Sequence, residues 1–229
     1  MSNLILIRHG QSQFNLERRF TGFYDVDLTS KGKEEAKYAG KLIKELNIQI
    51  DLCFTSQLIR AFDSLNIILK VLEEPNLKIN RAWELNERHY GGLTGLNKDE
   101  TIKKYGIDQV KIWRRSFDIP PPKMESDHPF KNKIKSKILG ESLKDTFNRV
   151  IPYFNKKIKP LILANKNILI VFHGNSCRAL LMEILNLSQN KIIELEVPTA
   201  NPLLIKFEKD FKVKNCKYLD KKRSKKILF

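Results

Sequence analysis

The sequence predicts an α/β fold with three layers, in which a mainly parallel central sheet lies between two layers of helices. Residues 4–7 and 168–172 are continuous apolar runs, and each is followed closely by His-Gly. Such runs are typical of parallel strands, which are buried on both faces. Segments with helical periodicity lie between the apolar runs, as in chains of βα units. At 229 residues the chain suffices for one large domain. We expect a single domain over residues 1–220 and a short basic tail over 221–229.

The first apolar run ends in Arg8, His9 and Gly10. Gly10 allows the backbone to turn sharply at the carboxyl end of the strand. Ligands of open α/β sheets bind at that edge. We therefore expect Arg8 and His9 to project into a binding site.

The second run ends in His173-Gly174 and repeats this pattern. If the two strands are neighbours in a parallel sheet, the two imidazoles face each other. A single histidine after a strand is more often structural, but two in the same setting favour a function. Because hydrogen bonds span roughly 3 Å, one bound group could not touch both rings if they lay more than about 10 Å apart.

The segment after Gly10 contains a long loop over residues 14–27, and long ordered loops in compact domains are often functional. Leu28-Thr29-Ser30 then predicts the start of an amphipathic helix over residues 31–46. An apolar run over residues 50–55 predicts the second strand. The helix expected at 59–72 carries Arg60 in its first turn. Arg60 alone could equally be a solvated residue, but its place after a strand favours the site.

The middle of the chain combines a short strand, expected at residues 78–82, with an unusual charged and aromatic stretch at residues 85–92. Helical patterns follow over residues 97–105 and 108–115, and three consecutive prolines stop the second one. Residues 123–140 are polar and rich in lysine. We expect them to form a mobile insertion over the edge of the sheet.

The last third of the chain completes the α/β pattern. Glu141-Ser142 predicts the start of a long amphipathic helix that reaches residue 158 and is interrupted at Pro152. The later elements are a strand over 167–172, helices over 176–187 and 189–195, a turn-rich loop over 197–202, and a hairpin from 203–207 and 211–214. Residues 221–226 are basic, and a disordered, solvated end is favoured over a nucleic-acid arm.

Composition limits the location and the partners of the protein. The formal net charge is +16, from 42 Lys and Arg against 26 Asp and Glu, which would attract small phosphorylated acids as well as nucleic acid. Three cysteines without CxxC spacing argue against a disulfide framework or a zinc site. We find no signal-peptide pattern and no run of about 18 apolar residues. We expect a cytoplasmic protein without a membrane partner.

Two histidines, arginines and a carboxylate at one sheet edge point to phosphoryl transfer to histidine. A neutral imidazole can attack phosphorus, and guanidinium groups can hold two phosphate oxygens at once. The sequence has no GxxxxGK[ST] loop, no HExxH pair and no carboxylates spaced for magnesium. The expected chemistry therefore uses no metal and no nucleotide.

Several motifs together resemble the 2,3-bisphosphoglycerate-dependent phosphoglycerate mutases of the histidine phosphatase superfamily. RHG alone is typical of the superfamily, whereas LNERHYG with WRR and HGNS is specific for the mutases. The matching stretches are residues 8–12, Asn15, 20–22, 55–56 with Arg60, 85–91, 95–98, 113–115, 141–143 and 173–176. The resemblance implies a phosphoglycerate mutase-like fold and the interconversion of 3-phosphoglycerate and 2-phosphoglycerate, as in glycolysis and gluconeogenesis.

The resemblance also implies the roles of individual residues. His9 would be phosphorylated, and Glu87 would exchange the proton of the substrate hydroxyl. Arg8, Arg60 and His173 would surround the transferred phosphoryl group. The implied substrate-binding residues are Gly10, Gln11, Ser12, Asn15, Thr21, Gly22, Arg88, His89, Tyr90, Lys98, Arg114, Arg115, Gly174 and Asn175. The residue patterns alone select the histidines and Arg60, and they do not rank Glu87 above other acids.

The implied cofactor is 2,3-bisphosphoglycerate, which primes the enzyme as phosphoryl donor, and no metal is implied. The implied partners are small phosphoglycerates, with a possible homodimer or higher homo-oligomer. Two features depart from the family pattern. Residues 129–141 form a shortened segment without the usual Arg-Arg-Tyr stretch, and the tail at 221–229 is basic instead of rich in small residues.

Three other functions are less favoured. A histidine phosphatase acting on a small phosphorylated acid would transfer the phosphoryl group to water, but the stretch with Lys98, Arg114 and Arg115 is typical of mutases. Synthesis of bisphosphoglycerate is less expected because Ser12 and residues 21–22 resemble the mutases. A nucleic-acid-binding protein would fit the pI of about 9.7, but such proteins usually carry aromatic stacking platforms or a known module.

Overall fold

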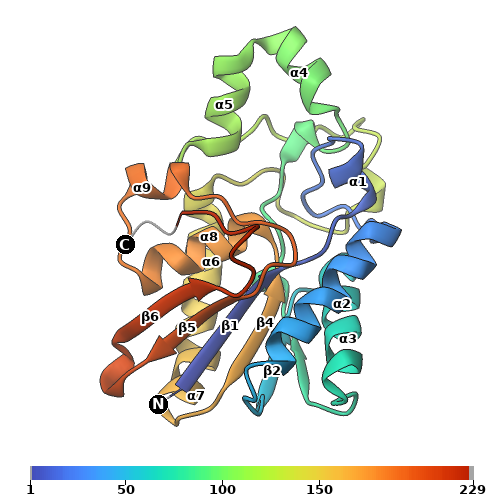
Figure 1. Ribbon diagram of the computed structural model, residues 1–229. Coiled ribbons are helices and arrows are strands. Elements are labelled where there is room, and N and C mark those ends of the chain that lie inside the picture. The colour runs from blue at the N-terminus through green and yellow to red at the C-terminus, as the bar shows by residue number, and fades with distance from the viewer. Residues whose placement is uncertain (1, 227–229) are drawn as a thin grey trace.

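A six-stranded sheet in the order β3-β2-β4-β1-β5-β6 forms the centre of the computed structural model, which describes residues 2–226 (Figure 1). The strands are β1 (Ser2–Arg8), β2 (Leu52–Thr55), β3 (Ile79–Arg81), β4 (Ile168–Phe172), β5 (Leu203–Phe207) and β6 (Val213–Tyr218). The first four strands are parallel, whereas β5 runs antiparallel to both β1 and β6. The predicted α/β fold with a mainly parallel sheet is confirmed.

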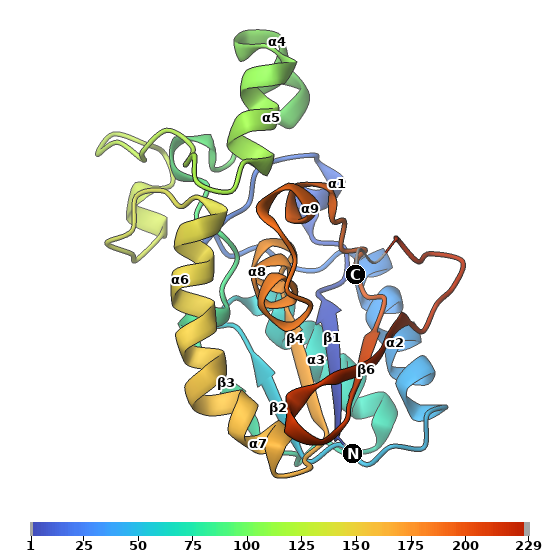
Figure 2. The same ribbon diagram turned by 90° about the vertical axis from the view of Figure 1, so that its left-hand side faces the viewer.

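Helices cover both faces of the sheet. The helices are α1 (Gln13–Leu16), α2 (Ser30–Lys44), α3 (Ile59–Leu72), α4 (Lys98–Tyr105), α5 (Ile107–Arg115), α6 (Leu143–Tyr153), α7 (Lys159–Leu163), α8 (Gly174–Ile184) and α9 (Gln189–Glu194). Helices α2 and α3 lie on one face and α6, α7 and α8 on the other, while α4 and α5 stand above the carboxyl edge (Figures 1 and 2). None of the helices within residues 2–226 has the length and apolar character that a membrane crossing requires.

The two faces of β1 explain why its sequence is apolar without alternation. Leu4 and Leu6 pack into the core beneath α6 and α8. Ile5 and Ile7 pack into the opposite core against α2 and α3. A strand that contributes to two cores must be apolar at every position. The buried strand therefore places Arg8 and His9 at the carboxyl edge of the sheet, which the helices on the two faces leave open.

The helix boundaries follow the predicted signals. The Thr29 side chain accepts a hydrogen bond from the Gly32 amide at the start of α2, and Ser142 forms a capping box with Asp145 at the start of α6. Pro152 lies inside α6, which continues to Tyr153, so the predicted interruption does not fall at the proline itself. A wider π-helical turn, Phe154–Ile158, follows and leads into α7.

Residues 123–140, expected to form a mobile insertion, make specific contacts in the structure. Met124 and Ile134 are buried. The Phe130 ring packs against the rings of Phe14 and Tyr24. A polar, lysine-rich composition does not reveal that a few apolar side chains anchor the segment on the loop after β1.

The beginning of the tail also contacts the body of the protein. Arg223 pairs with Asp220 at 2.6 Å and donates to the carbonyl oxygens of Thr199 and Ala200. Lys225 lies 3.4 Å from Glu196. The expected disorder of residues 221–226 thus gives way to defined contacts, while residues 227–229 of the predicted tail lie outside the described residues.

The first turn of α2 packs directly on the backbone that follows His9. A Cβ atom added to Gly32 would lie 2.0 Å from the Gln11 carbonyl oxygen, and one added to Gly10 would lie 2.1 Å from the Gly32 carbonyl oxygen. These contacts are between main chains, so no side chain can move to relieve them. The approach therefore requires glycine on both sides.

We predict that Gly32→Ala lowers the free energy of unfolding by about 2 kcal/mol, the usual cost of overpacking. The direction of this change is informative, because replacing glycine by alanine within a helix normally raises the free energy of unfolding by roughly 0.5–1 kcal/mol. Urea titration of both proteins measures the difference. The exposed neighbour Lys33 provides the control, since Lys33→Ala should change stability by less than about 0.5 kcal/mol. A Gly32→Ala protein at least as stable as the parent would contradict the packing argument.

Candidate active site

The two predicted histidines meet at the carboxyl edge of the sheet. β1 and β4 are paired in parallel up to Arg8 and Phe172, so His9 and His173 leave the sheet side by side. Their ring centroids lie 5.0 Å apart, well within the limit set by the sequence argument. Both side chains are buried, with relative exposures of 3% and 0%. One small group can therefore contact both rings.

The hydrogen bonds of His9 select its tautomer. Its Nδ1 atom lies 2.7 Å from the Gly10 carbonyl oxygen, which can only accept a hydrogen bond. Nδ1 therefore carries the proton, and Nε2 keeps a lone pair. The Nε group of Arg60 donates to Nε2 at 3.3 Å. Burial, together with the charges of Arg60 and Arg8, holds the pKa of His9 well below its usual value. His9 is thus a neutral imidazole with Nε2 as its nucleophilic atom.

Arg60 and Arg8 place positive charge beside this nucleophile. Arg60 lies in the first turn of α3, is buried, and donates to the carbonyl oxygens of Gly22 and Tyr24. Burial lowers the pKa of Arg60 to about 10 against the opposing charge of Glu87, so it remains a cation at neutral pH. Arg8 donates through Nη1 to the Val197 carbonyl oxygen. Both guanidinium groups are held by neutral acceptors and keep their charge available for an anion.

His173 is fixed by β2. Its Nε2 lies 2.7 Å from the hydroxyl oxygen of Ser56, the residue after that strand. The Nδ1 atom is buried and has no hydrogen-bond partner among residues 2–226. The pKa of His173 lies well below its usual value, mainly because the ring is buried and also because Arg60 is positively charged. His173 is therefore a second neutral imidazole that can donate to or accept from a bound group.

Glu87 presents one saturated and one free carboxylate oxygen. Its Oε1 accepts from the Arg88 amide at 2.8 Å, the Asn175 amide at 3.1 Å and the Asn175 side-chain nitrogen at 2.9 Å. Among the described residues, no donor contacts Oε2. A Cβ atom added to Gly174 would lie 3.8 Å from Oε2, which shows how closely α8 approaches. Oε2 is therefore the oxygen that can exchange a proton with a ligand.

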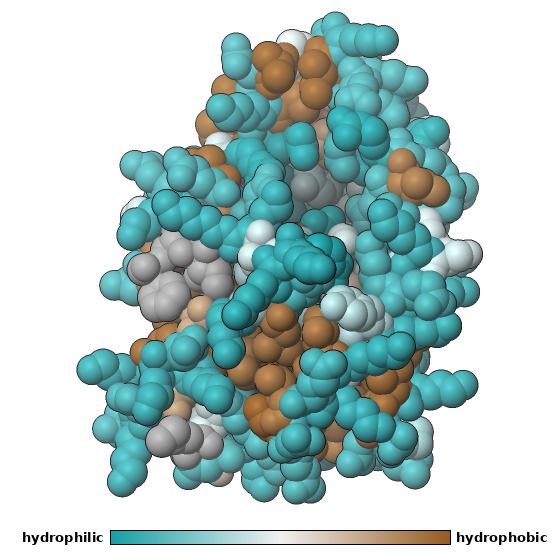
Figure 3. Space-filling model, viewed as in Figure 1, coloured by the Kyte–Doolittle hydropathy of each residue, from teal (hydrophilic) through white to brown (hydrophobic). Residues whose placement is uncertain are grey.

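These residues line a cleft with two lobes. The inner lobe, of about 60 Å³, contains His9 and Arg60, and the outer lobe, of about 280 Å³, opens beneath α4 and α5. Arg8, Glu87, Tyr90 and Lys98 line both lobes. Hydrophilic residues dominate the surface between α4, α5 and the sheet (Figure 3). The cations that line the two lobes are Arg8, Arg19, Arg60, Lys98, Arg114, Arg115, Arg178 and Lys225.

The cleft has unused hydrogen-bond donors that suit an anion. Nε of Arg8 is buried and has no partner within the described part of the chain. Arg88 stacks on the ring of Tyr90 at 4.7 Å, and its Nε and Nη1 are likewise buried and unpartnered there. Burial would raise the pKa of Tyr90, but the charges of Arg88 and Lys98 outweigh it and lower the pKa to about 8. The surplus of donors and positive charge fits phosphate and carboxylate groups.

Most of the predicted site residues lie in the cleft. Those that line it are Arg8, His9, Asn15, Thr21, Gly22, Arg60, Glu87, Tyr90, Lys98, Arg114, Arg115, Gly174 and Asn175. His173 and Arg88 lie directly behind the lining, against His9 and Tyr90. Gly10 holds His9 through its carbonyl oxygen. The structure thus gathers residues from six separate stretches of the sequence.

Besides His173, Arg88 and Gly10, three more predicted residues do not line either lobe, namely Gln11, Ser12 and His89. The Gln11 amide donates to Glu35, and Ser12 caps α1. His89 is buried, accepts from the Gly91 amide and packs against Phe23. Their contacts shape the loops around the site. A motif match does not separate such supporting residues from residues that contact a ligand.

The residues that sequence reasoning did not select include Arg19 and Lys225 in the lining and four that bond to the site or its support. Ser56 bonds His173, Arg178 bonds Asn175, and Arg149 donates to the Glu87 carbonyl oxygen at 2.9 Å. Glu196 lies 3.6 Å from Arg115 at the rim. The available signals were weak. Arg178 follows Asn175 by three helix positions, and Ser56 follows an apolar run in the same way as the histidines.

Arg149 and Glu141 form a buried pair beneath the loop that carries Glu87. The Arg149 guanidinium reaches both carboxylate oxygens of Glu141, at 2.7 and 2.9 Å. It also donates to the carbonyl oxygens of Glu84 and Asn86, while Glu141 accepts from the His89 amide. One ion pair therefore fixes the backbone on both sides of Glu87 and Arg88.

No group of three or more His, Cys, Asp or Glu side chains that could hold a metal ion occurs among residues 2–226. The three cysteines are free and buried. In apolar surroundings the pKa of Cys53 rises to about 12.

Comparison with known proteins identifies the family. The model of the histidine phosphatase superfamily (branch 1) matches residues 4–216. A Treponema denticola protein named 2,3-bisphosphoglycerate-dependent phosphoglycerate mutase is 50% identical over 225 residues, which cover 94% of this chain and 91% of the relative. A Hyphomonas neptunium protein of the same name is 46% identical, with 98% and 97% covered.

Solved structures support the same fold at much lower identity. One, titled Mycobacterial hydrolase 1, has a TM-score of 0.73 and 21% identity, with 94% of this chain and 96% of that chain covered. The phosphoglycerate mutase from Bacillus anthracis str. Sterne has a TM-score of 0.67 and 22% identity, with 93% and 90% covered. Taken with the family model and the relatives, these matches show that the chain belongs to the histidine phosphatase superfamily, in the family of 2,3-bisphosphoglycerate-dependent phosphoglycerate mutases.

Proposed function

We propose that this protein interconverts 3-phosphoglycerate and 2-phosphoglycerate by passing a phosphoryl group through His9. The observation that carries the proposal is the neutral His9, whose unprotonated Nε2 accepts a hydrogen bond from the cation Arg60 in a cleft that Glu87 also lines. A nucleophile, a proton carrier and anion-binding cations are the groups that this reaction needs. The names of the relatives support the choice of substrate.

In the step that phosphorylates His9, a bond forms between Nε2 and phosphorus while the bond from that phosphorus to an oxygen of a bisphosphorylated glycerate breaks, which leaves a monophosphoglycerate. The Gly10 carbonyl oxygen holds the Nδ1 proton and stabilises the imidazole as it becomes positive. Arg8, Arg60 and His173 are available to the phosphoryl oxygens as charge moves among them. Preorganised donors of this kind stabilise a transition state without rearrangement.

Glu87 supplies the proton that the departing oxygen needs. Oε2 donates the proton to the glycerate oxygen as the bond to phosphorus breaks. In the return transfer it accepts the proton of the hydroxyl that attacks the phosphohistidine. In the primed enzyme the phosphohistidine passes its phosphoryl group to the free hydroxyl of one phosphoglycerate, and His9 then takes the phosphoryl group from the other oxygen, which yields the isomer. The acid form and the base form of one carboxyl group thus serve both steps.

The outer lobe anchors the rest of the substrate. Lys98, Arg114 and Arg115 line it and can bind a carboxylate or a second phosphate. These contacts would hold the glycerate while its two oxygens exchange places relative to His9. When bound, 2,3-bisphosphoglycerate supplies the priming phosphoryl group, and the two cation-lined lobes and the unpartnered Arg8 Nε fit a ligand with two phosphates.

We predict that Glu87→Gln slows isomerisation at least about a hundredfold, because the amide keeps the size of the side chain but cannot exchange a proton. A coupled assay for 2-phosphoglycerate formed from 3-phosphoglycerate measures the rate, and thermal unfolding confirms that the variant is folded. In Glu45→Gln the same exchange is made at an exposed site on the end of α2, and this control should retain full activity. Near-normal isomerisation by Glu87→Gln would assign the proton transfer to another group.

We also predict that His9 stays neutral, with its proton on Nδ1, as the pH falls from 7.5 to about 6. Its pKa lies well below the usual 6.5, so protonation begins only at lower pH. Nitrogen NMR of histidine-labelled protein reports charge and tautomer, and His9→Asn assigns the signal. A protonation midpoint at or above about 6.5, or a proton on Nε2, would contradict the assigned nucleophile.

A further inference from the structure

Arg178 is a buried cation whose hydrogen bonds go to neutral groups. It lies on α8 with a relative exposure of 4%. Nε donates to the Ile192 carbonyl oxygen at 3.1 Å, and Nη2 donates to the same oxygen. Nη1 donates to Asn175 Oδ1 at 3.1 Å. Within residues 2–226 no carboxylate forms an ion pair with Arg178. Its placement is therefore not explained by charge pairing.

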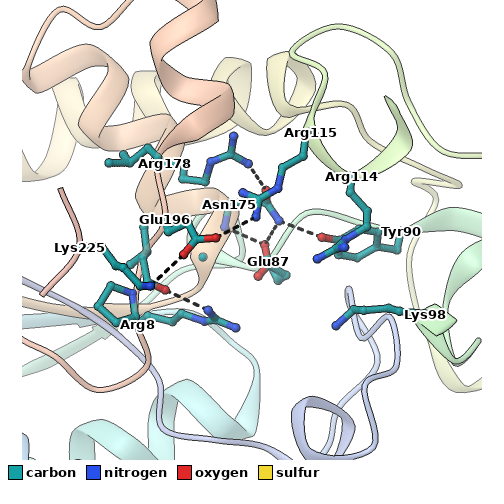
Figure 4. Close-up of a pocket in the computed structure, with 14 residues that line it drawn as sticks. Arg8, Glu87, Tyr90, Lys98, Arg114, Arg115, Asn175, Arg178, Glu196 and Lys225 are labelled. Carbon is teal, nitrogen blue, oxygen red and sulfur yellow. Dashed lines mark hydrogen bonds and ion pairs between the residues drawn. The ribbon is translucent and has the colours of Figure 1, made fainter. Parts of the chain in front are cut away.

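The contact with Arg178 determines how the Asn175 amide is oriented. A guanidinium group can only donate, so the Asn175 atom that faces it must be the oxygen. Nδ2 then points the other way, toward Glu87 Oε1 at 2.9 Å and the Tyr90 hydroxyl at 3.3 Å. Figure 4 shows Asn175 between Arg178 and Glu87, with both contacts dashed. Reversing the amide would turn its oxygen toward the carboxylate, where two acceptors repel each other.

The orientation of Asn175 in turn sets which oxygen of Glu87 is free. Three N–H groups saturate Oε1, two of which belong to Asn175. Oε2 is left toward the cleft for proton exchange. If the side-chain contact of Asn175 is lost, Oε1 keeps only two donors and the carboxyl group can rotate. Arg178 thus acts on Glu87 through one intervening side chain.

We propose that Arg178 is a positioning residue that locks the Asn175 amide and thereby aims Glu87 Oε2 at the reacting oxygen. This inference rests on the proposed role of Glu87 in proton transfer. The Ile192 carbonyl oxygen of α9 holds the guanidinium from the far side, so the short helix after α8 takes part in the alignment. Burial lowers the pKa of Arg178 to about 9, and the group still carries its charge at neutral pH.

The test compares two phosphoryl donors that differ in their need for a proton. The oxygen of a phosphoglycerate must be protonated as it leaves. The 4-nitrophenolate of 4-nitrophenyl phosphate leaves as a stable anion and needs no proton. Both donors depend on His9 and the surrounding cations, but only the first depends on the aim of Glu87. We measure kcat and KM for isomerisation, and the first-turnover burst of nitrophenolate release that accompanies phosphorylation of His9, in the same proteins.

Arg178→Met keeps the length of the side chain and removes all donors. We expect kcat for isomerisation to fall at least about tenfold, part of the 10²- to 10⁴-fold that a general acid contributes. KM and nitrophenolate release should each change less than about threefold. Arg178→Lys keeps a charged donor and should recover most of the isomerisation rate. Lys41→Met removes a cation from the exposed side of α2, outside both lobes of the cleft, and should leave both rates unchanged.

Other results would overturn the inference. Equal losses for both donors in Arg178→Met would indicate a general structural role, and a raised KM with unchanged kcat would indicate direct substrate binding. Unchanged rates for both donors would show that Asn175 needs no lock. Thermal unfolding of each variant identifies a folding defect. If Arg178→Met is misfolded, the rates of Arg178→Lys with the two donors decide whether the loss is selective for isomerisation or equal for both donors.

The same data separate this inference from the proposed function. If the parent protein does not isomerise phosphoglycerates, the proposed function fails. The comparison is then made between an alkyl phosphate that the protein hydrolyses and 4-nitrophenyl phosphate. A selective loss on the alkyl phosphate in Arg178→Met would keep the positioning role, and parallel losses would overturn it.

Discussion

Guanidinium groups that donate to backbone carbonyl oxygens hold the loops at the carboxyl edge of the sheet. Each arginine comes from one element and ties down another that is distant in sequence. The pairs are Arg8 with Val197, Arg60 with Gly22 and Tyr24, Arg88 with Trp113 and Arg114, Arg149 with Glu84, Asn86 and Glu87, and Arg178 with Ile192. Carbonyl oxygens satisfy the N–H donors but do not cancel the charge. The same bonds that order the loops therefore leave the cleft positive.

Burial, together with that uncancelled charge, accounts for the protonation state of the two site histidines. Buried histidines next to guanidinium groups stay neutral, which a nucleophile requires. An anionic ligand supplies the missing negative charge, so binding and catalysis use one arrangement. Arg149 is the exception, because Glu141 neutralises it. It supports the Glu87 loop from beneath the site, where surplus charge would serve no ligand and would be costly to bury.

The sequence was sufficient to predict the sheet, most helix boundaries and the meeting of His9 with His173, because apolar runs and capping residues are local signals. Glu87 was ranked only through family resemblance, since nothing local distinguishes it from other acids. Arg149 and Arg178 were missed for a physical reason. Most of their partners are backbone carbonyl oxygens, which every residue carries, so these contacts leave no pairing pattern in the sequence. The anchoring of residues 123–140 was missed likewise, because it depends on a few apolar side chains such as Phe130.

The central claim is that His9 Nε2 carries the phosphoryl group between substrate oxygens. The most direct measurement is mass spectrometry of the protein after brief exposure to 2,3-bisphosphoglycerate that carries ¹⁸O in its phosphoryl groups, followed by a chase with unlabelled 3-phosphoglycerate in the presence of a chelator. We predict one acid-labile phosphoryl group on His9, absent from His9→Ala, whose ¹⁸O label passes into phosphoglycerate at the rate of turnover and is replaced on His9 by an unlabelled phosphoryl group from the substrate. A phosphoryl group on another residue, or a label that stays on His9 while isomerisation proceeds, would contradict the account.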